Sequence, residues 1–247
     1  MSEGGILAGK AAVVTGGSRG IGRAIVERLC RDGADVVFSY VSGAGSADEV
    51  ARATAGRARA VRADLAEPEA AEQLMAQAEE RLGGLDILVN NAAVPFSPAP
   101  LAETEAADFD RVMAVNARAA FLTLRYAARH MRDGGRIVNV STMNTVRPAP
   151  GISPYVASKG ALEQLTAAAA LELGPRAITV NSVSPGATDT DLLRSVNPPE
   201  ALDQVARLTP LGRLGQPADI ASVVAFLVGP DGGWVTGQNL RAAGGLV

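Results

Sequence analysis

The sequence predicts an α/β protein: one domain over residues 1–247, with a doubly wound sheet of about seven parallel strands and helices on both faces. Short apolar segments rich in Val and Ile alternate with longer amphipathic segments along the whole chain. Such alternation is typical of βαβ units, whose parallel sheet is covered on both sides. No Gly/Ser linker divides the chain, and 47% hydrophobic residues are sufficient for a sizeable core.

The strands and helices follow from these two kinds of segment. The predicted strands are 11–15, 35–40, 58–63, 86–91, 136–141, 177–183 and, more weakly, 238–242. The predicted helices are 20–32, 46–55, 67–82, 104–133, 154–173 and 217–228. Ser153 is a candidate N-cap with Pro154 at the first helical position, and Gly174-Pro175 ends that helix. The polar, proline-interrupted segment 187–215 has no predicted strand, and we expect it to leave the sheet and cover the substrate.

Composition and charge argue against several classes of protein. The net charge of −3 gives no basic field for nucleic acid. The single Cys30 forms no internal disulfide and fits a reducing compartment, while the single His130 leaves little basis for a His-based metal site, so no metal is expected. The N-terminus lacks a basic region followed by an apolar one, and no apolar run reaches about 18 residues. We therefore expect a cytoplasmic protein without a membrane partner.

A glycine-rich turn follows the first predicted strand. The segment TGGSRGIG (15–22) runs directly into a predicted helix, and its spacing, TGxxxGxG, differs from the GxGxxG fingerprint. Glycines allow a tight turn and a close backbone approach to a pyrophosphate, whose charge is favoured at a helix N-terminus. The position after a strand therefore indicates a nucleotide-binding turn.

The segment SPYVASKG (153–160) places a phenol and an ammonium four residues apart. Lys and Arg together number 23, and only Lys10 and Lys159 are Lys. Since residues i and i+4 share a helix face, Tyr155 and Lys159 are expected to point the same way. An isolated YxxxK is more often an ordinary helix face, so the pattern needs support from the rest of the chain.

That support comes from a set of motifs spread over the chain. They are TGGSRGIG, Asp64-Leu65, NNAA (90–93), Asn116 in VMAVNARAAF, Tyr155 with Lys159, SPGATDT (184–190), PLGRLGQPADIASVVAFL (210–227) and TGQNLRAAGG (236–245). From Lys10 to Gly245 the chain resembles the short-chain dehydrogenase/reductase family in its short, single-domain form, and in particular the reductases related to 3-oxoacyl-carrier-protein reductase. The resemblance implies a Rossmann fold that interconverts a ketone and a secondary alcohol with a nicotinamide cofactor.

The same resemblance implies four catalytic residues: Asn116, Thr142, Tyr155 and Lys159. Tyr155 exchanges the proton, and Lys159 binds the ribose, lowers the tyrosine pKa from about 10 and relays protons through a water held by Asn116. The family usually has Ser thirteen residues before the Tyr, where this chain has Thr142, with Ser141 beside it. Alternation along the strand lets only one of the two hydroxyls face the nicotinamide. Spacing favours Thr142, and Ser141 remains the alternative.

The cofactor is expected to be NADP(H), with NAD less favoured. NAD-preferring relatives carry an acid at the end of the second strand, where this chain has Tyr40, with Ser39 and Ser42 nearby and Arg19 in the turn. Asp64 is placed by the resemblance at the adenine, Asn91 at the cofactor, and Asn90 in a structural bond. The expected cofactor-binding residues are Gly16, Ser18, Arg19, Gly20, Ile21, Gly22, Ser39, Tyr40, Ser42, Asp64, Leu65, Asn91, Ala92, Tyr155, Lys159, Pro185, Gly186, Thr188 and Thr190.

The expected partner is a small-molecule carbonyl compound whose identity the sequence does not reveal. The presumed pocket is mostly apolar and comprises Pro95, Phe96, Met143, Asn144, Leu192 and Val196, with Arg147 at its rim. Two alternatives stay open: a catalytically weak NAD(P)-binding regulator or scaffold, and, against the glycine spacing, an epimerase or dehydratase. Family habit also implies a homotetramer built on helices 104–133 and 154–173 and on the C-terminal strand.

Overall fold

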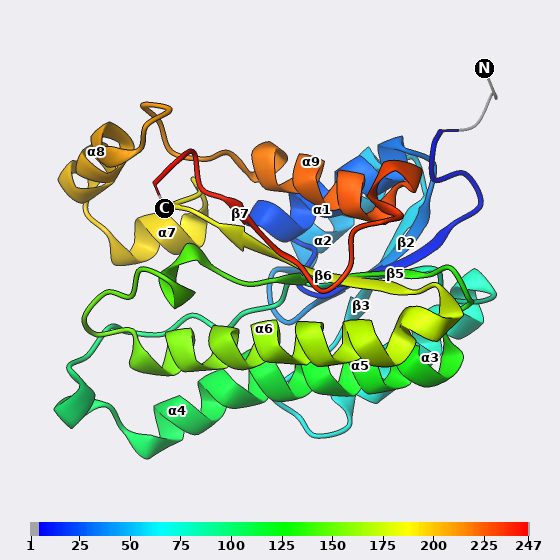
Figure 1. Cartoon of the computed structure of the whole chain (residues 1–247), viewed down its shortest axis with the longest axis horizontal. Helices are drawn as coiled ribbons and strands as arrows, with labels where there is room; N and C mark the ends of the chain where they lie inside the picture. Colours follow the sequence, from blue (N-terminus) through cyan, green and yellow to red (C-terminus); the bar gives the residue numbers. More distant parts are fainter. Residues whose placement is uncertain (1–4, 247) are drawn as a thin grey trace.

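Seven strands of the described chain lie side by side in a parallel sheet, in the order β3-β2-β1-β4-β5-β6-β7 (Figure 1). The computed structural model describes residues 5–246; residues 1–4, which open the N-terminal stretch considered above for a signal peptide, and Val247 lie outside it. The strands are β1 (Ala11–Val14), β2 (Asp35–Tyr40), β3 (Ala58–Arg62), β4 (Ile87–Asn90), β5 (Arg136–Val140), β6 (Thr179–Pro185) and β7 (Asn239–Ala242). Each agrees with its predicted range to within two residues at either end. The predicted parallel sheet is confirmed.

The strand order reverses at β1. This strand pairs with β2 on one side and with β4 on the other, so the chain winds outward in both directions from the centre. In such sheets the crevice beyond the carboxyl ends of the strands at the reversal is the usual place for a ligand. The glycine-rich turn follows β1 and therefore lies at that crevice.

Helices cover both faces of the sheet (Figure 1). One layer contains α1 (Gly20–Arg31), α2 (Ala44–Ala53) and α9 (Pro217–Val228); the other contains α3 (Ala70–Leu82), α4 (Ala106–Met113), α5 (Ala119–His130) and α6 (Ser153–Leu173). Neighbouring residues of one strand point to opposite faces of the sheet. Val14 and Phe38 pack in the core under the first layer, and Val13 and Val37 pack in the core under the second. All four are fully buried, which accounts for the nearly continuous apolar strands in the sequence.

The long helix predicted over 104–133 is interrupted. Between α4 and α5 lies a π-helical turn, η2 (Ala114–Arg118), which contains the buried Asn116. The helical pattern of apolar residues continues through this region, so it did not signal the break. A π-turn widens the helix by one residue and is frequent at functional sites.

Two further predictions about helices need correction. Helix α6 begins at Ser153, one residue earlier than predicted, and the residue at its N-cap is Ile152. Ser153 Oγ finds no hydrogen-bond partner among residues 5–246, so Ser153 is not the cap.

The short 3₁₀ turns are η1 (Leu101–Glu103), η3 (Met143–Thr145), η4 (Gly174–Arg176) and η5 (Pro230–Gly232).

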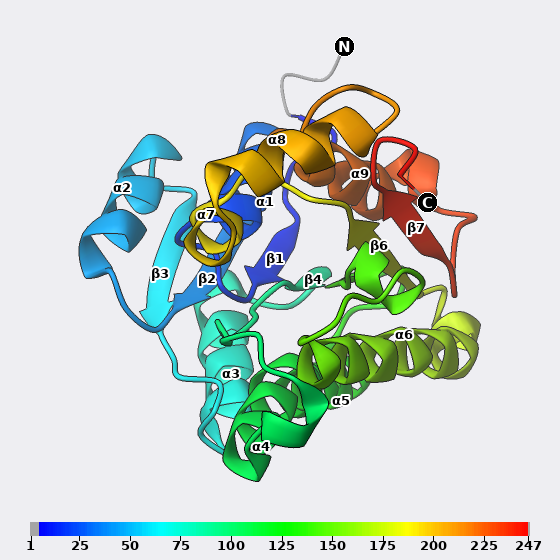
Figure 2. The same cartoon turned by 90° about the vertical axis from the view of Figure 1, so that its left-hand side faces the viewer.

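The segment 187–215 does leave the sheet, and it contains two helices, α7 (Asp191–Val196) and α8 (Pro199–Leu208). Its prolines suggested irregular structure, but Pro199 occupies the first turn of α8, where proline is well tolerated. Both ends of the segment meet: Gly215 N donates to Ala187 O (2.9 Å) and Asp189 N to Gly215 O (2.8 Å). The two helices lie beyond the end of the sheet that faces the viewer in Figure 2.

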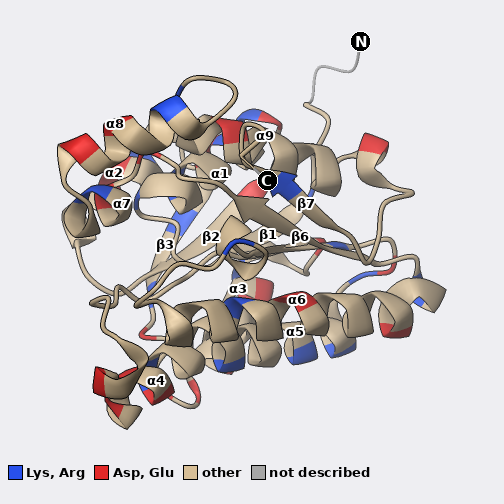
Figure 3. Ribbon diagram, turned by 60° about the vertical axis from the view of Figure 1, so that its left-hand side comes forward, with Lys and Arg blue, Asp and Glu red and all other residues tan. Residues whose placement is uncertain are grey.

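Charged groups are distributed unevenly over the outer helices. Figure 3 shows both positive and negative segments on α8, whereas α5 carries arginines and no acidic residue. At the end of β4 away from the glycine-rich turn, the buried carboxylate of Asp86 accepts from Ala11 N (2.9 Å) and pairs with Lys10 (3.4 Å) and Arg132 (2.8 Å). Within residues 5–246, no helix is both long and apolar enough to cross a membrane.

Candidate active site

Tyr155 and Lys159 project from the same face of α6 toward the end of β5. Lys159 is 2% exposed, and its Nζ donates to the carbonyl oxygen of Val140 (2.7 Å). The same Nζ lies 6.0 Å from the centroid of the Tyr155 ring. The predicted juxtaposition of phenol and ammonium is therefore present.

The pKa values of these two groups are shifted by burial. Burial lowers the pKa of Lys159 to about 8, because a charged ammonium is disfavoured away from water. Burial also raises the pKa of Tyr155, and a hydrogen bond with the hydroxyl of Thr142 partly offsets this. Lys159, whose ammonium donates to Val140 O, is not among the causes of this shift.

Thr142 and Ser141 follow β5 and engage different partners. The Thr142 hydroxyl accepts from Asn144 N (3.3 Å), and it lowers the pKa of Tyr155. The Ser141 hydroxyl donates to Glu163 Oε1 (2.6 Å), away from Tyr155. The arrangement thus has the divergence that strand alternation predicts, with Thr142 on the side of the tyrosine.

Asn116 holds the start of the loop after β4. Its Oδ1 accepts from Val94 N (3.1 Å) and its Nδ2 donates to Ser158 Oγ (3.1 Å). The Ser158 hydroxyl in turn donates to Tyr155 O (2.7 Å), within the first turns of α6. The side chain is 1% exposed, as its apolar sequence neighbours indicated. Its hydrogen bonds connect the π-turn, the loop and the helix of Tyr155.

The residues of the presumed substrate pocket differ in their exposure, and one of them packs on the phenol. Phe96, from the loop after β4, stacks on the Tyr155 ring with centroids 5.2 Å apart and planes 18° apart. Met143 is buried beside Thr142, whereas Leu192 and Val196 are exposed on α7. Pro95 is exposed, Asn144 is half-buried, and Arg147 Nη1 donates to Leu246 O (3.1 Å) at the C-terminal end of the described chain.

Polar side chains hydrogen-bond to the backbone of the glycine-rich turn. Asn91 Nδ2 donates to the carbonyl oxygens of Thr15 and Gly16 (3.0 Å each), and Ser39 Oγ accepts from Gly16 N (3.0 Å). Asn91 therefore supports the turn through its amide. Ser39 is 2% exposed and does the same, which corrects its expected place beside a cofactor phosphate. A Cβ at Gly22 would lie 2.0 Å from Gly16 O, so only glycine fits this close packing.

The N-terminus of α1 fits an anionic group. Within the described chain, Arg19 at the N-cap makes no side-chain capping bond, and the first turn contains no acid. The first N–H groups of this helix therefore lack side-chain partners, and the helix dipole favours a negative charge there. Gly20 has φ +54°, and a Cβ there would meet only the Thr190 side chain, at 3.3 Å. The turn could hold the diphosphate of a dinucleotide.

The segment after β6 closes over this turn. Gly186 N donates to Ala242 O (3.0 Å), and a Cβ at Gly186 would lie 2.9 Å from Ala243 Cα. Thr188 is buried with its hydroxyl on Gly186 O (3.0 Å), and Thr190 Oγ1 caps α7 by accepting from Leu193 N (3.2 Å). Since Thr190 also lies opposite Gly20, the segments SPGATDT and TGGSRGIG approach each other at this point.

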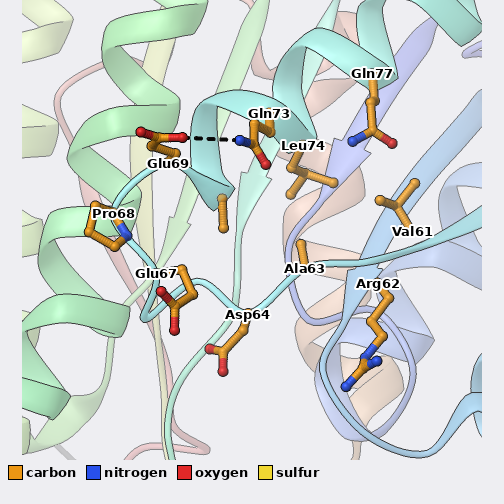
Figure 4. Close-up of a pocket in the computed structure, with 11 residues that line it drawn as sticks. Val61, Arg62, Ala63, Asp64, Glu67, Pro68, Glu69, Gln73, Leu74 and Gln77 are labelled. Atoms are coloured by element: carbon orange, nitrogen blue, oxygen red, sulfur yellow. Dashed lines mark hydrogen bonds between the residues drawn. The ribbon is translucent and has the colours of Figure 1, made fainter.

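Further predicted cofactor residues lie in the glycine-rich turn or follow β2 and β3. Arg19 and Ser42 are exposed, and Tyr40 is half-buried at the end of β2. Asp64 is exposed, and its Oδ1 accepts from Ala66 N (3.0 Å). Asp64 borders an open hollow of about 470 Å³ between β3 and α3, and Figure 4 shows its carboxylate directed away from Leu74 and Gln77. This hollow is separate from the crevice at Tyr155.

The other predicted cofactor residues are buried or half-buried. Ser18, Leu65 and Pro185 are buried, and Ile21 and Ala92 are half-buried. The Leu65 side chain packs in the hydrophobic core together with residues of α3, which explains why it is apolar. The predicted structural role of Asn90 is present, since its Nδ2 donates to Asn139 Oδ1 (2.9 Å).

Sequence reasoning missed several polar groups that position the site. Thr15 Oγ1 accepts from the backbone N–H groups of Asn91 and Ala92 (3.0 Å each). Ser158 binds Asn116, and Glu163 binds Ser141 and Thr145. Glu163 could have been noticed, because it lies four residues after Lys159 on the same helix.

Comparison with known proteins agrees with this geometry. A family model described as enoyl-(acyl carrier protein) reductase matches residues 16–247. A short-chain type dehydrogenase/reductase of Picea abies is 41% identical over 253 residues, covering 98% of this chain and 93% of that protein. The chain belongs to the short-chain dehydrogenase/reductase family. It is therefore an oxidoreductase of that family, as predicted.

Other short-chain dehydrogenase/reductases are equally similar. Versicolorin reductase 1 of Aspergillus parasiticus is 39% identical over 260 residues, with 99% of each chain covered. The solved structure of an angucycline C-6 ketoreductase, LanV, with bound NADP has a TM-score of 0.92 and 44% identity, covering 99% of this chain and 98% of that one. A short-chain dehydrogenase from Burkholderia cenocepacia in complex with NADP has the same TM-score and 43% identity, covering 97% and 98%.

Proposed function

We propose that this protein is an NADPH-dependent ketoreductase, with Tyr155 as the proton donor. The observation that carries the proposal is that Thr142, Tyr155 and Lys159 lie together at the carboxyl end of β5, the same edge of the sheet at which the uncapped N-terminus of α1 follows β1. The nicotinamide supplies a hydride when bound. Relatives named as reductases, and structural neighbours solved with NADP, support the same chemistry.

The protein's own groups act on the oxygen of the ketone. The Tyr155 hydroxyl gives its proton to the carbonyl oxygen as the alkoxide develops, and the Thr142 hydroxyl donates a second hydrogen bond to it. Because its pKa is raised, Tyr155 carries its proton at neutral pH, which is the state that a reduction requires. Once the proton has left, the neighbouring Lys159 ammonium favours the phenolate.

The preference for NADPH follows from the end of β2. Tyr40 stands where an acid would repel a 2′-phosphate, and residues 38–46 contain neither Asp nor Glu. Arg19 is exposed at the N-terminus of α1, and its side chain makes no hydrogen bond or ion pair with another described residue. Its guanidinium is available for the phosphate, and the Ser42 hydroxyl lies on the same exposed end.

Turnover tests the function directly. Oxidation of NADPH with a panel of activated aryl and alkyl ketones, followed by absorbance, should give turnover that is lost in Tyr155→Phe. Binding of NADPH without turnover on any ketone would instead support a regulator or scaffold.

The cofactor preference has a matched pair of variants. Arg19→Ala should raise KM for NADPH about 10- to 100-fold, since a charge-assisted hydrogen bond contributes about 1.5–3 kcal/mol, and leave NADH unaffected. Arg23→Ala on the same helix is the control, because Arg23 pairs with Glu27 (2.7 Å). A parent enzyme with higher kcat/KM for NADH would contradict the preference.

We also propose that the protein works as a homotetramer. Support comes from large apolar side chains left exposed on the expected contact elements: Phe121 on α5 (44%), Leu171 on α6 (83%) and Trp234 before β7 (99%). Exposed apolar groups of this size commonly mark protein contacts.

A cytoplasmic location completes the proposal. It rests on the single cysteine, Cys30, which is buried in α1 and whose pKa burial raises to about 12. A thiol of this kind forms no disulfide and fits a reducing compartment. Fractionation of the source cells, with activity found outside the cytosolic fraction, would contradict it.

A further inference from the structure

The carboxylate of Glu163 binds the segment that carries Thr142. Glu163 is on α6, one turn beyond Lys159 and two turns beyond Tyr155. Its Oε1 accepts from Ser141 Oγ (2.6 Å) and from Thr145 Oγ1 (2.8 Å). Both lengths lie within the usual range of O–H···O hydrogen bonds.

A third hydroxyl approaches the same oxygen but serves another partner. Ser184 Oγ lies 3.4 Å from Glu163 Oε1 and 2.7 Å from Asn239 Oδ1. A hydroxyl has one hydrogen, and the shorter contact takes it. Glu163 is therefore held by two donors, both from the segment after β5.

The two donors stand on either side of Thr142. The Thr145 hydroxyl also approaches Thr142 O (3.0 Å), and Thr145 N donates to the same oxygen (3.4 Å). Thr142 thus sits in a short turn whose two ends bind one carboxylate oxygen. Any shift of this turn away from α6 lengthens at least one contact with Glu163.

We propose that Glu163 is a positioning residue for the reduction. By tying Ser141 and Thr145 to the helix that carries Tyr155, it fixes the distance between the hydroxyls of Thr142 and Tyr155. This inference rests on the proposed function, in which both hydroxyls bind the same carbonyl oxygen. A misplacement of about 1 Å at such a site can cost about 10²-fold in rate.

A double-mutant cycle tests whether Glu163 acts through Thr142. The variants are Glu163→Ala, Thr142→Ala and the two combined, assayed for kcat and KM with NADPH and an activated ketone. We expect Glu163→Ala to lower kcat about 10- to 100-fold with KM for NADPH unchanged. In the Thr142→Ala background the same change should cost less than about twofold.

Two further variants complete the comparison. Glu163→Gln keeps an acceptor oxygen and should recover most of the lost kcat. Glu172→Ala is the matched control, because Glu172 is exposed on the same helix and its side chain makes no hydrogen bond or ion pair with a described residue. If Glu163→Ala fails to fold, Ser141→Ala combined with Thr145→Val removes the two donors instead and should show the same dependence on Thr142.

The outcomes separate this inference from the function on which it rests. An equal loss of kcat in both backgrounds, or no loss at all, would overturn the positioning role and leave Glu163 as a stabilising group. A Thr142→Ala variant with parental kcat would overturn the proposed role of Thr142, and the inference with it.

Discussion

Lys159 is the residue at which the needs of stability and of catalysis differ most. An ammonium with 2% exposure is expensive to keep charged, even with one hydrogen bond to Val140 O. Arginine, which this chain uses at nearly every other basic position, is broader and does not lose its charge near neutral pH. A compact group whose pKa is about 8 can both carry charge and release a proton.

The cost of this charge should appear in the pH dependence of stability. The pKa of Lys159 falls from 10.5 to about 8 on folding, so the charged form is disfavoured in the native state by about 3 kcal/mol. That penalty is present in full below pH 8 and disappears as the pH rises from 8 to 10.5. Lys159→Met should therefore be more stable than the parent at pH 7, although inactive, and the difference should vanish near pH 10. Urea unfolding at both pH values measures it; a difference independent of pH would contradict the assignment.

The third catalytic hydroxyl gives a second prediction at this scale. Thr142→Ala should lower kcat about 10²- to 10³-fold, the usual loss for an oxyanion donor, while Thr142→Ser stays near the parent. Ser141→Ala should cost far less, because its hydroxyl is directed to Glu163. The reverse ranking, with cofactor binding intact in both variants, would assign the role to Ser141.

Sequence reasoning located side chains better than it described their surroundings. The spacing usual in the family located Thr142, and helix periodicity placed Lys159 on the same face as Tyr155. Ser39 and Asn91 bind backbone atoms of the glycine-rich turn that are distant in the sequence, and no local pattern encodes such contacts. The direction of the Tyr155 pKa shift likewise depends on burial, which appears only in the folded chain.

At the level of elements, the clearest departure is the π-turn η2 within the long helix predicted over 104–133. Its sequence, AVNAR, continues the apolar pattern of the helix before it, so periodicity alone predicts no break. The turn directs Asn116 inward, where the amide satisfies both Val94 N and Ser158 Oγ. A π-helical turn contains one residue more than an α-helical turn, and this extra residue allows Asn116 to reach both partners.

Removing that amide should affect activity and stability together. Asn116→Ala leaves the N–H of Val94 unsatisfied, which costs about 1–3 kcal/mol for a buried group. Because the loop after β4 carries Phe96, kcat should fall as well. Thermal unfolding and turnover measure the two effects, and Asn116→Asp, which keeps the acceptor, should retain more stability than Asn116→Ala. Equal melting temperatures for parent and Asn116→Ala would contradict this account.

Over the whole molecule, the sequence predicted the sheet well because parallel strands buried on both faces leave continuous apolar segments. Figure 1 shows the two helical layers that such strands require. The two helices of 187–215 were missed, since they are short and their prolines resembled breaks. Assembly is also a property of the whole molecule, and it depends on exposed groups that periodicity does not distinguish from the core.

Light scattering tests the assembly. The parent should have about four times the 25.2 kDa mass of one chain, and Leu171→Arg with Trp234→Ala should lower that mass. Charge placed in an apolar contact is costly, which is the reason for choosing arginine. Leu101→Arg is the control, because Leu101 is 77% exposed but lies outside the expected contact elements. A monomeric parent at micromolar concentration would refute the tetramer.

The meeting of the two ends of 187–215 has a consequence for evolution and protein engineering. Because Ala187, Asp189 and Gly215 are bonded to one another, the chain departs and returns at a single point. Residues 191–214 can then be exchanged as a cassette, with little entropic cost for a replacement of different length. The glycine-rich turn and the buried strands stay unchanged in such a chimera. New substrate ranges could arise in this family by replacing the cassette while inheriting the chemistry.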